Sequence, residues 1–142
     1  MNKAKINRLV LNEMKKIYYD ESTPYYDWMG YRITEDNKPS YHHIEKREDL
    51  KKANKSIEAT VENGAYLGKH SHEVLHRIEL VDLELYEAWN YLFLVINKME
   101  CYPIEDVWKM IYSLQEKSEA LLNQDDRILR RLKKEVAKSK VC

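Results

Sequence analysis

Glycine, proline and cysteine are all scarce in this sequence. Its 142 residues include three glycines, three prolines and two cysteines. An all-β fold with many tight turns needs more glycine and proline than this, so a helix-rich chain is expected. Cys101 and Cys142 do not form a CxxC pair, so neither a disulfide framework nor a cysteine-ligated zinc site is indicated.

Long apolar runs are missing as well. The longest is Tyr91–Ile96, which is far too short to cross a bilayer, and the N-terminal residues contain no apolar stretch typical of a signal peptide. These features predict a cytoplasmic protein that makes no membrane contact.

Neither sign of charge is in excess. The chain has 24 basic and 24 acidic residues and a formal net charge of zero. Proteins that hold DNA over a broad surface are usually basic, so any contact with nucleic acid must be made by a local patch. Basic residues do cluster, in the segment that follows Glu45 and again between Arg127 and Lys140.

Apolar spacing predicts an α+β, helix-rich fold. Helices are expected over residues 4–18, 72–80 and 83–99, from about Pro103 onwards, and over 128–136. Short strands are expected at 26–33, at 40–44 and up to Leu67, with a polar segment at 45–60 that contains one helical turn. Ser71 is expected to cap the helix that begins at His72.

The elements suggest a division into two parts. Residues 1–80 would carry an N-terminal helix and the functional site. Residues 81–142 would form a helical extension that packs on this core or serves as an interface. A homodimer or a protein partner could bind through those C-terminal helices.

All five histidines lie between His42 and His76. Histidine is the commonest metal ligand and the usual general base near neutral pH. His72 and His76 are four residues apart, so on a helix they lie on one face and could bind one metal ion. His42 is a candidate third ligand from a strand, and its neighbour His43 would then be a free imidazole beside the metal.

This set of residues suits metal-dependent hydrolysis of a phosphodiester. The metal would neutralise the phosphate, and a histidine would take a proton from the attacking water. Adjacent strand residues point to opposite faces, so His42 and His43 are expected at a strand end or a bulge. Asn63 could fix the loop or the tautomer of His43, and His70 is expected to be an exposed loop residue.

About residues 40–78 resemble the HNH nucleases, which have the ββα-metal or His-Me finger fold. The resemblance rests on His42-His43, on Asn63, on the nine-residue step from Asn63 to His72, and on His76 four residues later, as in the nuclease colicins. It implies a ββα-metal core with an N-terminal helix and a C-terminal helical extension. HNH proteins with a structural zinc have cysteine at the positions of Gly68 and Ser71, so that zinc is not expected here.

The resemblance also implies a role for each residue. His43 would be the general base and Asn63 the residue that orients it. The metal ligands would be His42, His72 and His76, holding one divalent ion such as Mg²⁺, Mn²⁺, Ni²⁺ or Zn²⁺. The implied activity is cleavage of double-stranded DNA. A further cation would stabilise the transition state, and the candidates are Arg32, Arg47 and Arg77.

Three other interpretations stay open. His72–His76 is a literal HExxH motif, which in zinc metalloproteases provides two ligands, with Glu73 here as the base. An HNH-like domain of phage or mobile-element origin could instead have lost turnover and act as a binding protein or inhibitor. Finally, the histidines could hold a purely structural zinc, with His70 as the fourth ligand.

Overall fold

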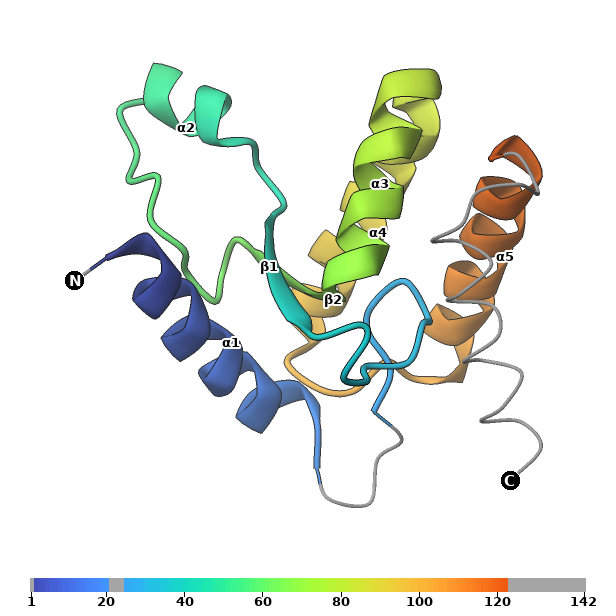
Figure 1. Ribbon diagram of the computed structural model, residues 1–142, viewed down its shortest axis with the longest axis horizontal. Coiled ribbons are helices and arrows are strands. Elements are labelled where there is room, and N and C mark those ends of the chain that lie inside the picture. The colour runs from blue at the N-terminus through green and yellow to red at the C-terminus, as the bar shows by residue number, and fades with distance from the viewer. Residues whose placement is uncertain (1, 21–24, 123–142) are drawn as a thin grey trace.

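A two-stranded hairpin lies between an N-terminal helix and two later helices in the computed structural model, which describes residues 2–20 and 25–122 (Figure 1). None of the helices described is long and apolar enough to cross a membrane. The fold is α+β and helix-rich. Its elements in chain order are α1 (Lys3–Tyr18), β1 (Pro39–His43), α2 (Arg47–Lys52), β2 (Gly64–Gly68), α3 (Lys69–Val81), α4 (Leu83–Met99) and α5 (Glu105–Leu121).

The hairpin is the centre of the fold. Strand β1 pairs with β2 in antiparallel register, with His42 opposite Ala65 and His43 opposite Gly64. Helix α1 contacts β1, α3 contacts both strands, and α4 contacts β2, which is buried along its whole length. Because α3 follows β2 directly, the chain runs strand, loop, strand, helix, and this order brings the histidines of β1 next to those of α3.

Several predicted elements are confirmed. Helix α4 has the predicted bounds, α1 begins one residue before the predicted start, and α2 is the helical turn expected in the polar segment. Asn2 caps α1, since its side-chain oxygen accepts a hydrogen bond from the Lys5 backbone N–H at 2.8 Å. The largest fully buried side chains include six aromatic ones, those of Trp28, Trp89, Tyr18, Tyr31, Tyr66 and Phe93.

The predicted strand at 26–33 is wrong. This segment forms only an isolated bridge between Tyr26 and Arg32. It folds around the buried carboxylate of Asp27, whose Oδ1 accepts hydrogen bonds from the N–H groups of Met29 (3.0 Å) and Tyr31 (2.9 Å). The other oxygen, Oδ2, accepts from the Gly68 N–H at 2.9 Å, which attaches the segment to the end of β2.

The predicted start of the third helix is also wrong. Helix α3 begins at Lys69 rather than His72, and Ser71 lies inside it. Its first turn is capped from a distance, because Oδ1 of the buried Asn37 accepts from the His70 N–H at 2.9 Å. A Cβ atom at Gly68 would lie 2.2 Å from the Asn37 side chain, so this close approach requires glycine.

Asp27→Ala is expected to lower the free energy of unfolding by about 3 kcal/mol or more. The three N–H groups that Asp27 accepts from lose their partner, and each unsatisfied buried donor costs about 1–3 kcal/mol. Urea unfolding followed by circular dichroism measures the change. Asp36→Ala, at an exposed position three residues after this segment, is the matched control and should change stability by less than about 0.5 kcal/mol. A loss below about 1 kcal/mol for Asp27→Ala would contradict this account.

The later helices share one core with the earlier part of the chain. Asn97 of α4 donates hydrogen bonds to the carbonyl oxygens of Val61 (2.6 Å) and Gly64 (2.9 Å), and its own backbone oxygen accepts from the Tyr18 hydroxyl at 2.6 Å. One continuous set of buried apolar residues extends from Leu11 to Leu122. The helix predicted at 128–136 and the basic cluster from Arg127 lie outside the described residues.

Candidate functional site

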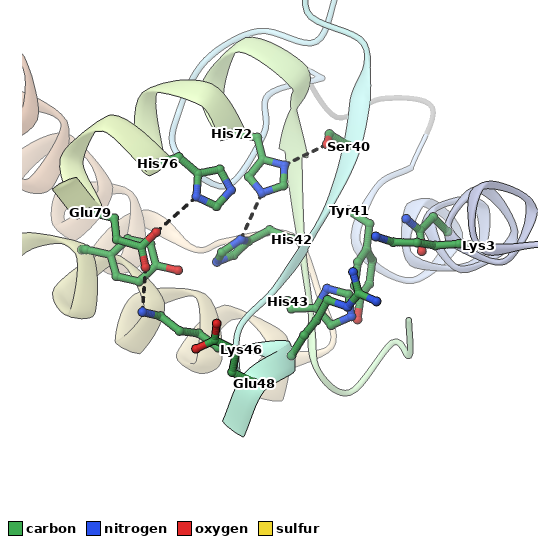
Figure 2. A pocket seen from close by; sticks show the side chains of 13 residues that line it. Lys3, Ser40, Tyr41, His42, His43, Lys46, Glu48, His72, His76 and Glu79 are labelled. Atoms are coloured by element: carbon green, nitrogen blue, oxygen red, sulfur yellow. Dashed lines mark hydrogen bonds and ion pairs between the residues drawn. The ribbon is translucent and has the colours of Figure 1, made fainter. Parts of the chain in front are cut away.

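A cleft of about 560 Å³ opens between β1, α2 and α3, with α1 and α4 at its borders. Four of the five histidines line it: His42, His43, His72 and His76. Figure 2 shows His72 and His76 side by side on α3, with His42 facing them from β1. The fold therefore brings together residues that are up to 34 positions apart in the sequence.

His42 is buried and held in one tautomer. Its Nε2 lies 2.7 Å from Asn90 Oδ1, and an amide oxygen only accepts, so Nε2 carries the proton. The Asn90 amide nitrogen is directed to Tyr86. Burial raises the pKa of Tyr86, and the hydrogen bond from Asn90 lowers it by a smaller amount. This orientation of the amide leaves Oδ1 for His42. Burial lowers the pKa of His42 to about 3, so the ring is neutral and Nδ1 keeps its lone pair.

His42 and His72 present two nitrogens to each other. His42 Nδ1 lies 3.3 Å from His72 Nε2, as the dashed line in Figure 2 marks. Two imidazole ligands of a tetrahedral zinc ion lie about 3.3–3.4 Å apart, given Zn–N distances of about 2.0–2.1 Å. His72 Nδ1 lies 3.0 Å from the Ser40 hydroxyl. Burial, with a smaller effect of His76, lowers the pKa of His72 to about 4.

His76 stands next to His72, and their ring centroids are 4.6 Å apart. Its Nδ1 lies 3.4 Å from Glu79 Oε1, and its side chain is 55% exposed. In residues 2–20 and 25–122, no group of three or more histidine, cysteine, aspartate or glutamate side chains is already arranged to hold a metal ion. His42 and His72 form a pair of facing nitrogens, while His76 is turned towards Glu79.

The three candidate ligands nevertheless share one pattern. Each imidazole has one ring nitrogen engaged by a partner at the edge of the cluster: Asn90 for His42, Ser40 for His72 and Glu79 for His76. Metal-binding histidines almost always engage their second ring nitrogen in this way, which fixes the tautomer and the ring orientation. The donor chemistry of the cluster therefore fits a divalent ion.

His43 is the last residue of β1, but the strand end does not turn both imidazoles to one side as expected. His43 points to the other side of the strand from His42, because adjacent strand residues alternate between the two faces (Figure 2). Its Nε2 lies 3.1 Å from the Ile57 carbonyl oxygen, so Nε2 carries the proton and Nδ1 is left as an acceptor. Burial, then the charges of Arg47 and Lys3, lower the pKa of His43, so the ring is neutral at pH 7.

Asn63 holds the loop rather than His43 itself. Its Oδ1 accepts from the Glu45 N–H at 2.8 Å, and its Nδ2 donates to the Glu45 carbonyl at 3.2 Å. The Tyr41 hydroxyl fixes the same loop further along, by donating to the Thr60 carbonyl at 2.7 Å. Asn63 thus acts on His43 indirectly, by closing the loop that carries the Ile57 carbonyl.

Asn90 and Glu79 contribute to the cleft but were not among the residues expected from the sequence. Helical spacing could have indicated both. Glu79 lies three residues after His76 and seven after His72, on the same face of α3. Asn90 and Asn97 are seven residues apart on one face of α4, where the surrounding side chains are apolar. The Ile57 carbonyl is a backbone group and has no signature in the sequence.

The charged side chains near the cleft divide into two groups. Of the three arginines considered, Arg47 lines the cleft, as does Lys3 of α1, whereas Arg32 and Arg77 do not. Glu73, the base of the protease interpretation, is also outside the lining and lies 3.9 Å from His70 Nδ1.

His70 itself belongs to α3 and its side chain is only 18% exposed, so it is not the exposed loop residue that was predicted.

Comparison with known proteins adds nothing to the geometry of the cleft. No family model, no curated protein and no solved structure matches this chain.

Proposed function

We propose that this chain is a metal-dependent endonuclease of the ββα-metal, HNH type that hydrolyses phosphodiester bonds of DNA. The observation that carries the proposal is the state of the four imidazoles in one cleft. Three of them, from His42, His72 and His76, each have one nitrogen engaged at the edge of the cluster. The fourth, His43, is held by the Ile57 carbonyl with Nδ1 free of a proton.

The first three histidines would hold one divalent ion. His42 would use Nδ1 and His72 would use Nε2, and His76 would bring its Nε2 to them by a shift of its exposed side chain that keeps Nδ1 on Glu79. A bound ion supplies positive charge that neutralises the phosphate and stabilises the leaving oxygen. Imidazole ligands suit Zn²⁺ and Ni²⁺, whereas Mg²⁺ and Mn²⁺ prefer oxygen ligands.

His43 would act as the general base. Its Nδ1 takes a proton from the attacking water, while the Nε2–H keeps its hydrogen bond to the Ile57 carbonyl. That hydrogen bond stabilises the imidazolium that forms. The lowered pKa keeps His43 unprotonated, and so able to accept a proton, at neutral pH.

Arg47 and Lys3 would bind the DNA backbone beside the base. Both line the cleft, and both are close enough to His43 for their charges to lower its pKa. Lys46 is already paired with Glu79, its Nζ lying 2.7 Å from Oε2. In a chain without net charge, these two cations make the local patch that a nucleic-acid contact requires.

Lys3→Ala with Arg47→Ala is expected to weaken DNA binding and to reduce its salt dependence. If each side chain neutralises one phosphate, the slope of log K against log salt becomes shallower by about 1.8, or about 0.9 per contact. Fluorescence anisotropy with a labelled duplex measures the slope, in a His43→Ala background that leaves the DNA intact. The control is Lys51→Ala with Lys52→Ala, which removes the same charge from exposed positions of α2. Equal slopes for the two double variants would contradict a phosphate contact at Lys3 and Arg47.

Plasmid cleavage in the presence of Mg²⁺, Mn²⁺, Ni²⁺ or Zn²⁺ tests the proposal directly. Nicked or linear product that disappears with EDTA supports it. Absence of cleavage with all four ions, from protein that is folded and binds metal, overturns it.

One observation favours a second candidate, a binding protein without turnover. The described part of the chain holds no group of three ligand side chains in place for a metal ion. This candidate predicts DNA binding without cleavage in the same assays. The protease interpretation has less support, because Glu73 is directed to His70 and does not line the cleft.

A further inference from the structure

We propose that Glu79 is a positioning residue for the candidate metal ligand His76, and that Lys46 opposes this effect of Glu79. The inference rests on the proposed function, since it concerns the same metal site. It adds an acidic residue that is not part of the resemblance to HNH nucleases, which ends at about residue 78.

The two oxygens of Glu79 have different partners. Oε1 lies 3.4 Å from His76 Nδ1, and a carboxylate only accepts, so Nδ1 carries a proton. In the neutral ring this leaves Nε2 with the lone pair that a metal requires. The Glu79 side chain is 25% exposed and that of His76 is 55% exposed, so the contact is open to solvent on the His76 side. A carboxylate that accepts from a ligating histidine raises the basicity of the other ring nitrogen.

Lys46 occupies the second oxygen. Its Nζ lies 2.7 Å from Oε2 and 5.3 Å from the centroid of the Tyr86 ring (Figure 2). The ammonium neutralises the carboxylate, so Glu79 becomes a weaker acceptor for His76 and attracts a nearby cation less. Lys46 therefore acts against metal binding although it is not a ligand.

A purely structural role for Glu79 makes a different prediction. Lys46 follows β1 and Glu79 lies on α3, so their ion pair also ties the loop to the helix. If that tie were the whole effect, removing either partner would change the metal site in the same direction. If Glu79 positions His76 and Lys46 opposes this effect, removing Glu79 weakens metal binding, whereas removing Lys46 strengthens it.

Isothermal titration with Zn²⁺ distinguishes the two roles. Glu79→Ala is expected to weaken affinity by about 10- to 100-fold, the usual effect of losing such a partner. Lys46→Met should bind more tightly than the parent, and an equal affinity would contradict the opposing effect of Lys46. The matched control is Glu73→Ala, which removes the other Glu–His pair with the same spacing on α3, His70–Glu73, and should have no effect.

The tautomer of His76 provides a second measurement that needs no metal. Long-range ¹H–¹⁵N spectra of the metal-free protein should show Nδ1–H in the parent and in Glu73→Ala, and should lose this preference in Glu79→Ala. Glu79→Gln keeps an acceptor oxygen and should retain the tautomer, which separates the effect from misfolding of the alanine variant.

Two results would overturn the inference: equal weakening by Glu79→Ala and Lys46→Met, or an unchanged His76 tautomer in Glu79→Ala. If the parent protein binds metal and cuts DNA, and Glu79→Ala has the same metal affinity and cleavage rate, this inference is wrong and the proposed function stands. A parent that binds no divalent ion would remove both.

Discussion

His43→Ala is expected to reduce plasmid cleavage by about 10²- to 10⁴-fold, the usual contribution of a general base. His43 is the one imidazole of the cleft that is oriented by a backbone carbonyl, Ile57, and lies on the opposite side of β1 from the candidate metal ligands. Its loss should leave metal affinity within about threefold of the parent, because it contributes no ligand. Initial rates of nicking measure the effect, and titration with Zn²⁺ measures metal affinity.

Two further measurements identify the base. Added imidazole should restore part of the rate of His43→Ala, since a free imidazole can occupy the vacated space and accept the proton. His70→Ala serves as the control, because it removes a histidine that does not line the cleft and should cut at the parental rate. If His43→Ala cuts as fast as the parent, the proposed mechanism is wrong.

The sequence predicted the four histidines that line the cleft because the spacing within each pair is short. His72 and His76 are one turn apart on α3, and His42 and His43 are neighbours at the end of β1, so local periodicity places each pair. Their partners could not be placed in this way. Asn90 lies 48 residues after His42, and only the packing of α4 against the hairpin brings its oxygen to Nε2.

Predictions from local strand and helix propensity were wrong where a buried polar side chain determines the backbone conformation. The aromatic and β-branched residues of 26–33 suggested a strand, yet the Asp27 carboxylate gathers N–H groups from its own segment and from Gly68, which a flat strand would not allow. The start of α3 was placed three residues late because its cap, Asn37, comes from 33 residues before His70. In both places a buried side chain accepts from backbone N–H groups, and one of the contacts joins residues that are distant in sequence: Asp27 with Gly68, and Asn37 with His70.

The conformation of the long polar loop between β1 and β2 is set by side-chain hydrogen bonds to its backbone more than by its charges. Tyr41 bonds both the N–H and the carbonyl of Thr60, and Asn63 bonds both backbone groups of Glu45. Between these contacts the Ile57 carbonyl is held against His43. The basic residues that made the loop conspicuous in the sequence are mostly exposed on its outer side, and Arg47 is the one whose charge acts on the base.

His72→Ala is expected to abolish stabilisation by metal. An ion that binds only the folded protein raises stability by about 2.7 kcal/mol at 100 times its Kd, which appears as a higher midpoint of thermal unfolding. His72 provides one of the two nitrogens that face each other at 3.3 Å, so its loss leaves His42 without the opposing ligand. A loss of affinity of 100-fold or more would reduce the stabilisation by Zn²⁺ or Ni²⁺ at that concentration to less than about 0.5 kcal/mol.

His72 is a better test of the site than His42, because His42 is buried against Phe93 and its removal would also disturb the core. His70→Ala is the matched control: it lies on the same helix two residues away, outside the cleft, and should keep the full metal-dependent shift. If His70→Ala lost the shift and His72→Ala kept it, the ligand set would be wrong. If both variants lost it, His70 would belong to the site, which is the arrangement that a four-histidine structural zinc requires.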